Sequence, residues 1–207
     1  PQNPKTPYHN FKLLKHAKNI IHNSTFSYIR QRDMLGLGHA ILSGQPLIGQ
    51  ESFAVILADD LCDHSNQCVI SQMISIYSKY KCPIIAIEEV PLDQTNKYGI
   101  IKGDLIEDSD DIYKVTEMVE KPDKLNAPSN LAIIGRYILT PDIFDILKTI
   151  KPDKNHEIQL TDALLKLQVE EGINAVMTDA SIYDCGNKLG YLSANLAVGM
   201  QDPKSRG

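Results

Sequence analysis

The sequence predicts an α/β protein with a mixed, mainly parallel β-sheet flanked by helices. Two continuous apolar runs, residues 53–57 (FAVIL) and residues 83–87, are typical of strands covered on both faces in a parallel sheet. A helical pattern over residues 67–79 separates them, and such alternation is the signature of a layered α/β sheet. Strand-like stretches without helices between them follow later in the chain, so the sheet is expected to be mixed.

The part of the chain before the first apolar run is predicted to contain short elements. Residues 1–10 hold three prolines and no periodicity, which favours a linker or surface arm. Residues 11–21 fit a short amphipathic helix, and residues 25–29 form a β-rich stretch. The glycine turn at residues 36–38 precedes a helix that is expected to begin near His39.

The remaining elements follow from apolar patterns and from proline and glycine signals. Strands are expected over residues 98–102, 113–119, 131–139, 173–177 and 181–184. Helices are expected after Thr140 with Pro141 in the first turn, over residues 157–171 with a stop at Gly172, and from Lys188. The acidic loop over residues 104–111 is interpreted as a solvated hairpin tip rather than a cation site.

Composition indicates an ordinary globular protein and excludes several classes. With 207 residues, of which 43% are hydrophobic and 23% charged, the chain can bury one core, so a single domain over residues 1–207 is expected. The net charge of −5 argues against a protein that holds nucleic acid by neutralising its phosphates. The cysteines form no C-x-x-C pair and the histidines no H-x-x-x-H spacing, so free thiols are expected instead of a zinc site.

The apolar runs and the first residues of the chain indicate where in the cell the protein is expected. No run approaches the roughly 20 apolar residues that span a bilayer, and the first residues lack the order of a signal peptide. A cytoplasmic protein without membrane attachment is therefore expected. The chain begins with Pro rather than Met and ends on a polar run, which suggests a fragment of a longer protein.

Carboxylates lie at the ends of two predicted strands. Asp59 and Asp60 follow FAVIL after Ala58, at the C-terminal end of an expected parallel strand, where open α/β sheets bind their ligands. A carboxylate there can hold Mg²⁺ against substrate phosphates, but capping of the next turn explains the pair equally well. Asp184 ends a short strand before a glycine turn, and a turn that starts with Asp-x-Gly would also account for it.

Five further residues, in three stretches of the chain, are candidates for ligand contacts. Glu120 and Lys121 in VEKP end a strand side by side, and a regular strand would point them to opposite faces unless its end re-aims them around a sugar phosphate. The alternative is a solvated strand edge. Gln31 could offer its side-chain amide to the edge of a flat base, and Gly36 could let the backbone approach that base closely. Gly99 interrupts a strand, which is consistent either with a β-bulge or with a ligand close to the backbone.

Taken together, the sequences of these stretches and their order resemble those of the bacterial UTP:glucose-1-phosphate uridylyltransferases, or UDP-glucose pyrophosphorylases. The resemblance extends from about Gln31 to Gly199. The matching stretches are RQ, GLGHAIL, FAVILADD, YGI, VEKP, APSNLAIIGRYIL, EIQLTDAL and DCGNKLGY. The resemblance implies a Rossmann-like nucleotide-diphospho-sugar transferase fold and an enzyme in which glucose 1-phosphate attacks the α-phosphorus of UTP and pyrophosphate leaves.

The resemblance also assigns roles, with Mg²⁺ as the cofactor. Asp59 and Asp184 match the two metal ligands, and Asp59 is preferred to Asp60 by alignment. Gln31 and Gly36 match uracil contacts. The remaining matches contact the sugar phosphate: Gly99, Glu120 on the glucose hydroxyls, and Lys121 on the phosphate. Asp59, Lys121 and Asp184 are the expected catalytic residues, the partners are the small molecules UTP and glucose 1-phosphate, and the intact protein is expected to be a homo-oligomer.

The chain departs from the family pattern in two places. Ala58 stands where the family is expected to have a proline, and Asp60 where an apolar residue is usual. More importantly, the family begins with a glycine-rich loop that cradles the triphosphate, and this chain has no such segment. A truncated sheet is therefore expected, and if the 207 residues are the entire molecule, little or no transferase activity.

Other functions stay open on the sequence alone. A related nucleotidyltransferase that transfers a thymidylyl group or uses another sugar phosphate shares most of the pattern. A non-catalytic module that binds a sugar nucleotide is a second alternative. A phosphoacceptor receiver domain would explain Asp59 and Asp60 but neither VEKP nor DCGNK.

Overall fold

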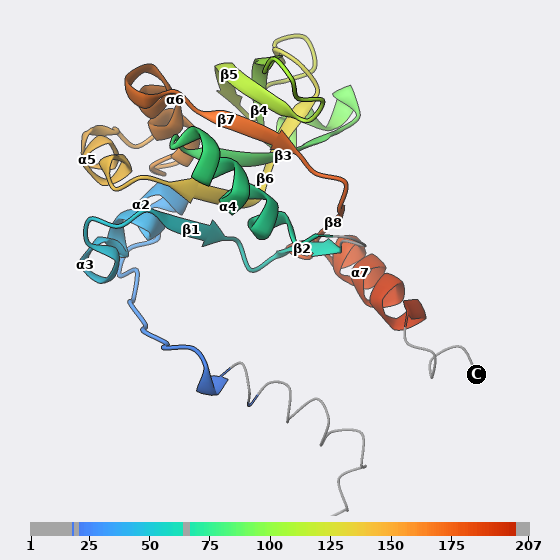
Figure 1. The fold of residues 1–207 in the computed structure, drawn as a ribbon, viewed down its shortest axis with the longest axis horizontal. Coiled ribbons are helices and arrows are strands. Elements are labelled where there is room, and N and C mark those ends of the chain that lie inside the picture. The colour runs from blue at the N-terminus through green and yellow to red at the C-terminus, as the bar shows by residue number, and fades with distance from the viewer. Residues whose placement is uncertain (1–17, 19–20, 64–66, 202–207) are drawn as a thin grey trace, which may run out of the picture. The chain divides into compact units, whose positions relative to one another are not determined.

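The computed structural model describes residues 18, 21–63 and 67–201 (Figure 1). Its contacts divide the chain into two units, Pro1–Arg30 and Gln31–Gly207. In the first unit, residues 24–30 have no regular secondary structure, so the β-rich stretch predicted over residues 25–29 is not a strand. A strand needs hydrogen bonds to a neighbouring strand, which side-chain preference does not supply. The predicted arm over residues 1–10 lies outside the described residues, and so does most of the helix predicted over residues 11–21.

The second unit alternates helices and strands. Its helices are α2 (Gly36–Ser43), α3 (Gln45–Ile48), α4 (Val69–Tyr80), the 3-10 helix η1 (Leu92–Lys97), α5 (Asp142–Thr149), α6 (Leu160–Glu171) and α7 (Lys188–Gln201). Its strands are β1 (Phe53–Ile56), β2 (Asp60–Asp63), β3 (Ile84–Glu89), β4 (Gly99–Leu105), β5 (Ile112–Glu120), β6 (Leu131–Leu139), β7 (Asn174–Met177) and β8 (Ser181–Asp184). Most predicted elements are confirmed, and β6 has the predicted bounds.

Six of the strands form one mixed sheet in the order β1-β6-β3-β7-β5-β4, so the predicted α/β fold with a mixed sheet is confirmed. The expected predominance of parallel pairs is wrong for the described strands, because only β3 and β7 pair in parallel. The physical reason is β6, which lies antiparallel to β1, β3 and β4. The acidic loop after β4 is confirmed as a hairpin, since β4 and β5 pair antiparallel on either side of it.

Strand β1 differs from its prediction in direction and in burial. It pairs antiparallel with β6 alone among the described strands, and its residues alternate between half-buried and exposed. A continuous apolar run was expected to be covered on both faces, but coverage depends on neighbouring strands and helices that the run itself does not specify. The other apolar run behaves as predicted, because Ile84, Ile85, Ala86 and Ile87 of β3 are all completely buried.

The two faces of the sheet carry separate apolar clusters. Ile85 and Ile87 pack in the cluster that holds α5 and α6, whereas Ile84 and Ala86 pack in the cluster that holds α4. This alternation follows from the two-residue period of a strand. Figure 1 shows α2, α5 and α6 grouped on one side of the view and α4 across the strands.

A second, two-stranded sheet pairs β2 with β8, and β2 was not predicted. The register places Asp60 directly opposite Asp184. Two carboxylates that are far apart in the sequence are therefore brought to one place by this small sheet.

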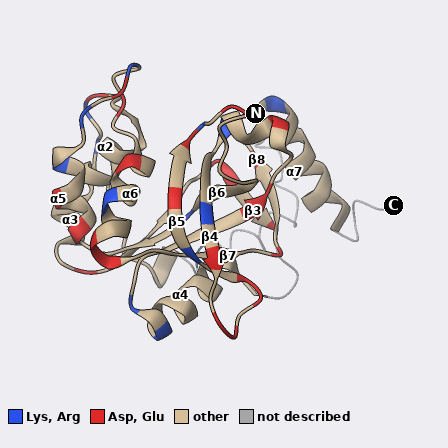
Figure 2. Ribbon diagram, turned by 90° about the horizontal axis from the view of Figure 1, so that it is seen from above, with Lys and Arg blue, Asp and Glu red and all other residues tan. Residues whose placement is uncertain are grey.

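Charged residues are spread over the unit. Figure 2 shows Lys and Arg on separate elements, interleaved with Asp and Glu, so the described part presents no continuous basic stripe along one element. None of the described helices is at once long enough and apolar enough to cross a membrane.

The fold predicts a large energetic role for Phe144, which is 1% exposed in the main cluster and stacks on Phe53 with ring centroids 5.2 Å apart. Phe144→Ala is expected to lower the free energy of unfolding by about 3–5 kcal/mol, because it leaves a cavity in a packed core. Urea denaturation measures this loss. Ile74→Ala, on the exposed side of α4, is the control and should change stability by less than about 0.5 kcal/mol. A loss in Phe144→Ala no larger than in the control would contradict the packing described above.

Candidate functional site

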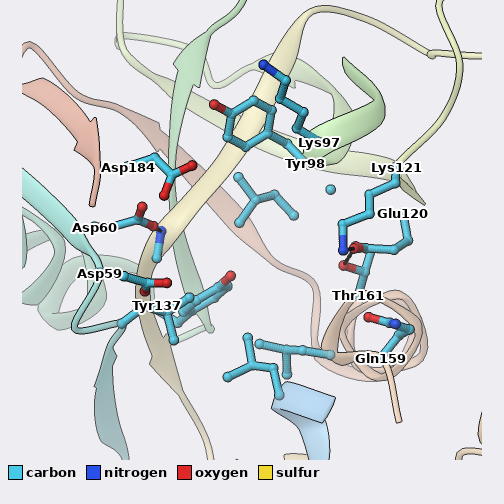
Figure 3. A pocket seen from close by; sticks show the side chains of 16 residues that line it. Asp59, Asp60, Lys97, Tyr98, Glu120, Lys121, Tyr137, Gln159, Thr161 and Asp184 are labelled. Carbon is cyan, nitrogen blue, oxygen red and sulfur yellow. Dashed lines mark hydrogen bonds and ion pairs between the residues drawn. The ribbon is translucent and has the colours of Figure 1, made fainter. Parts of the chain in front are cut away.

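A cavity of about 220 Å³ opens where β6, the loop after β1, the ends of β5 and β8 and the start of α6 meet. Figure 3 shows two groups of polar and charged side chains across it. The acidic group consists of Asp59, Asp60 and Asp184. The opposite group contains Glu120, Lys121 and Thr161. Negative and positive charges therefore face a common space, as expected of a site for a phosphorylated ligand held with a cation.

The structure brings Asp59 and Asp184 together at Gly186. The point that a Cβ atom would occupy on Gly186 is 3.0 Å from Asp184 Oδ1 and 3.1 Å from Asp59 Oδ2. The Cys185 amide also donates to the Asp59 carbonyl at 2.6 Å, which ties the loop after β1 to the end of β8. The two predicted metal ligands thus present oxygens to one small region.

The Asp184 carboxylate is oriented by its own turn. Its Oδ1 accepts a hydrogen bond from the Gly186 amide at 2.9 Å, and its Oδ2 accepts one from Asn187 Nδ2 at 2.8 Å. The turn role that the sequence left open is therefore present. It does not compete with ligand binding, because each carboxylate oxygen keeps a lone pair that the turn does not use.

Asp60 has different surroundings from Asp59. Its Oδ2 accepts a hydrogen bond from the Gly135 amide at 2.8 Å, which directs this oxygen toward β6. Burial raises the pKa of Asp60, the hydrogen bond from Gly135 opposes that rise, and the charges of Asp59 and Asp184 add to it. Asp60 is thus already engaged in the fold, whereas Asp59 faces Asp184.

Arg136 holds the backbone of the loop that carries these aspartates. Its Nη1 donates to the carbonyl oxygens of Leu57 at 3.1 Å and Gly135 at 2.8 Å, and its Nη2 donates to the Asp60 carbonyl. The residue is only 9% exposed. The sequence analysis missed it, although an arginine inside the apolar strand LAIIGRYIL is a signal, because buried arginines are rare unless paired.

Glu120 and Lys121 both line the cavity, so the end of β5 re-aims them as the sequence analysis required. Lys121 has a φ of 47°, which takes the chain out of the strand, and its Nζ lies 3.4 Å from Glu120 Oε1. The other oxygen, Glu120 Oε2, accepts a short hydrogen bond from Thr161 Oγ1. Lys121 and Thr161 therefore each contact one oxygen of the Glu120 carboxylate.

Gly99 allows this arrangement by its lack of a side chain. It pairs with Glu120 in the β4–β5 ladder. A Cβ atom on Gly99 would lie 3.0 Å from Thr161 Oγ1 and 3.2 Å from Glu120 Oε2. A larger residue would press on the pair that orients the carboxylate, so Gly99 belongs to the site through its backbone.

Gln31 and Gly36 contact each other but do not line the cavity. Gln31 Nε2 donates to the Gly36 carbonyl at 3.1 Å and lies 3.0 Å from His39 Nδ1. The cavity begins one residue later, at Leu37. The structure therefore places these two predicted residues in one cluster at the start of α2, beside the cavity.

Sequence reasoning missed several lining residues, among them Tyr98, Tyr137 and Thr161. Tyr98 precedes Gly99 and Thr161 lies in EIQLTDAL, so the resemblance covered both stretches without assigning them a role. Tyr137 is 7% exposed, and Figure 3 shows its hydroxyl directed into the cavity. Burial raises the pKa of Tyr137, so the hydroxyl keeps its proton and can donate.

The donor set suits Mg²⁺ better than a metal that requires a cage of protein ligands. Within the described residues, no cluster of three or more His, Cys, Asp and Glu side chains could enclose an ion. Mg²⁺ commonly binds one or two carboxylates and completes its shell with waters and substrate phosphates. Asp59 and Asp184 provide such a pair, so the residues present fit the metal.

The comparisons with known proteins agree on one family. The family model described as "Nucleotidyl transferase" matches residues 5–201. The UTP–glucose-1-phosphate uridylyltransferase of Pseudomonas aeruginosa PAO1 is 52% identical over 184 residues, which cover 88% of this chain and 65% of that protein. The protein of the same name from Staphylococcus haemolyticus is 43% identical over 179 residues, covering 86% of this chain and 61% of the relative. The chain thus spans a little less than two thirds of these relatives.

Solved structures give the same picture. A UDP-glucose pyrophosphorylase complexed with UDP-glucose has a TM-score of 0.88 at 52% identity, covering 93% of this chain and 73% of the other. A UTP-bound enzyme of this kind from Acinetobacter baumannii has a TM-score of 0.83 at 35% identity, covering 95% and 68%. A putative glucose-1-phosphate thymidylyltransferase from Bacillus anthracis, at 18% identity and a TM-score of 0.68, shares the fold.

The approach of β6 to the loop after β1 predicts that Gly135 cannot be enlarged. A Cβ atom there would overlap Asp60 Oδ2 and lie 2.6 Å from Leu57 Cβ. Gly135→Ala is expected to lower the free energy of unfolding by about 1–3 kcal/mol, the usual cost of overpacking. Gly199→Ala, in α7 with nothing within 4 Å of the added atom, is the matched control and should leave stability unchanged or raise it by up to about 1 kcal/mol. Urea denaturation of both variants decides the matter, and equal stabilities would contradict the close approach.

Proposed function

Because the chain belongs to the nucleotidyl transferase family, we propose that it is the part of a UTP–glucose-1-phosphate uridylyltransferase that binds the sugar phosphate and the metal. The observation that carries this proposal is the single cavity with Asp59 and Asp184 on one side and Glu120 and Lys121 on the other. The resemblance inferred from the motifs is confirmed by the identity to UTP–glucose-1-phosphate uridylyltransferases and by the structural neighbours. The activity, substrates and partners are proposals, since the relatives are longer.

In the proposed reaction, a phosphate oxygen of glucose 1-phosphate forms a bond to the α-phosphorus of UTP. The bond between the α-phosphorus and the bridging oxygen of the β-phosphate breaks, and pyrophosphate leaves with that electron pair. No general base is needed, because the attacking oxygen is already anionic. The protein's task is to position two anions in line and to offset their charge.

Glu120 and Lys121 are proposed to position the sugar phosphate. Lys121 supplies a positive charge for the phosphate, and Glu120 accepts hydrogen bonds from glucose hydroxyls. Thr161 and Lys121 already fix the Glu120 carboxylate. Binding therefore costs little reorganisation of these side chains, which is what a positioning site requires.

Asp59 and Asp184 are proposed to hold the Mg²⁺ ion, with Asp60 supporting the loop. When bound there, the metal would neutralise charge on phosphate oxygens of the substrates. The two carboxylates present their oxygens from two different elements. The Cys185 amide holds the backbone carbonyl of Asp59, and Asn187 holds the side chain of Asp184.

Gln31 and Gly36 are proposed to bind the uracil base beside the cavity. The contact from Gln31 Nε2 to the Gly36 carbonyl leaves the amide oxygen of Gln31 available to accept from a base edge.

By resemblance, we further propose a cytoplasmic homo-oligomer whose partners are small molecules. A thymidylyl donor, another sugar phosphate or a purely binding role are the alternatives, and a panel of nucleotides assayed for pyrophosphate release separates them.

The first test is calorimetric titration of this chain with UDP-glucose, with and without Mg²⁺. Binding is expected to need Mg²⁺ and to weaken at least about tenfold in Asp59→Ala, because the loss of a direct ligand costs no less than the loss of a group that only orients one. Lys121→Met is expected to weaken it at least tenfold through the loss of a charge-assisted contact. Lys102→Met changes an exposed lysine of β4 that does not line the cavity and serves as the matched control. Mg²⁺-independent binding, or an equal loss in the control, would refute the assignment.

Tyr137 is expected to donate a hydrogen bond to the ligand from the floor of the cavity. Tyr137→Phe should weaken UDP-glucose binding about fivefold, since one neutral hydrogen bond contributes on the order of 1 kcal/mol. Tyr80→Phe, in α4 and outside the cavity, should bind like the unchanged chain. The same titration measures both variants, and full affinity in Tyr137→Phe would show that this hydroxyl does not meet the ligand.

A further inference from the structure

Arg136 lies in the middle of β6, in register with Ile56 at the end of β1. Its side-chain hydrogen bonds within the described part all go to carbonyl oxygens, those of Leu57, Gly135 and Asp60. The guanidinium is thus buried close to Asp60, and its hydrogen bonds among the described residues go to carbonyl oxygens and not to the Asp60 carboxylate. Its contacts are with the backbone, which indicates a role in shaping the loop.

The carbonyls of Leu57 and Asp60, which accept hydrogen bonds from Arg136, lie on either side of Asp59 in the chain. The loop from Leu57 to Asp60 joins β1 to β2, and the Leu57 amide donates to the Gly135 carbonyl at 2.9 Å. Arg136 Nη1 reaches the carbonyl at the start of this loop and Nη2 reaches the one at its end. Between them, the Asp59 carbonyl accepts from the Cys185 amide at 2.6 Å. Arg136 therefore holds the backbone on both sides of Asp59, while Cys185 holds the Asp59 carbonyl itself.

We propose that Arg136 is a positioning residue for the metal-binding carboxylates, which holds the loop over residues 57–60 so that Asp59 faces Asp184. The chemistry requires arginine, because its planar fork offers two nitrogens to two carbonyls of one loop. A lysine would keep the positive charge but reach fewer acceptors. The inference rests on the proposed function in one respect, which is that Asp59 and Asp184 bind the metal ion of the reaction.

The test compares Arg136→Lys with Ile138→Ala, a change two residues along the same strand at a side chain that packs in the α4 cluster. Amide hydrogen exchange is measured for residues 57–60 and for Cys185. Binding of Mn²⁺ alone is measured by electron paramagnetic resonance, with Asp59→Ala as the variant that removes a ligand. Arg136→Lys is expected to speed exchange in this loop and at Cys185 selectively and to weaken Mn²⁺ binding roughly tenfold, in the range typical of groups that orient metal ligands. Ile138→Ala should lower stability and leave Mn²⁺ affinity unchanged.

Two results would overturn the inference. One is Mn²⁺ affinity in Arg136→Lys equal to that of the unchanged chain, and the other is an equal loss of Mn²⁺ affinity in Ile138→Ala. Failure of the proposed function looks different, because it appears as absent UDP-glucose binding in the unchanged chain. The exchange and Mn²⁺ measurements need no nucleotide, so they decide the role of Arg136 in either case.

Discussion

Strand β6 connects the architecture to the site. It forms hydrogen bonds with β1, β3 and β4, and it carries Gly135 and Arg136 at the point where β1 ends. The Gly135 amide holds Asp60 while the Arg136 guanidinium holds the loop backbone. A buried arginine is costly unless its donors are used, and here the loop carbonyls use them. The loop and the strand are thus each stabilised by the other.

The electrostatics of the cavity favour a cation between two groups of residues. Asp59, Asp60 and Asp184 repel one another, and this repulsion contributes to the raised pKa of Asp60, to which burial contributes most. The charge of Arg136 opposes the rise in the pKa of Asp60, while Lys121 lies across the cavity (Figure 3). A bound divalent ion would relieve the remaining repulsion and attract phosphate oxygens. In the proposed function, the acidic side would take the metal and the lysine side the phosphate of the ligand.

The element pattern was largely readable from the sequence, whereas strand pairing was not. The apolar runs located β1 and β3, and proline and glycine signals located α5 and the end of α6, because these are local effects of period and backbone conformation. The same runs gave the wrong direction for β1, since both parallel and antiparallel strands can be continuously apolar. Strand β2 was missed because DLCD has no apolar pattern and exists as a strand only through its pairing with β8.

The sequence by itself determined the residue types and their local settings: carboxylates at strand ends, an acid and a base before Pro122, and motif wording that pointed to one family. Only the tertiary structure decided which of these share a cavity. It joined Asp59 to Asp184 and Gly99 to Glu120, placed Gln31 and Gly36 beside the cavity, and added Arg136, Tyr137 and Thr161. The physical reason is that these contacts join residues far apart in the chain through strand register and burial, and neither of these is set by the residues adjacent in sequence.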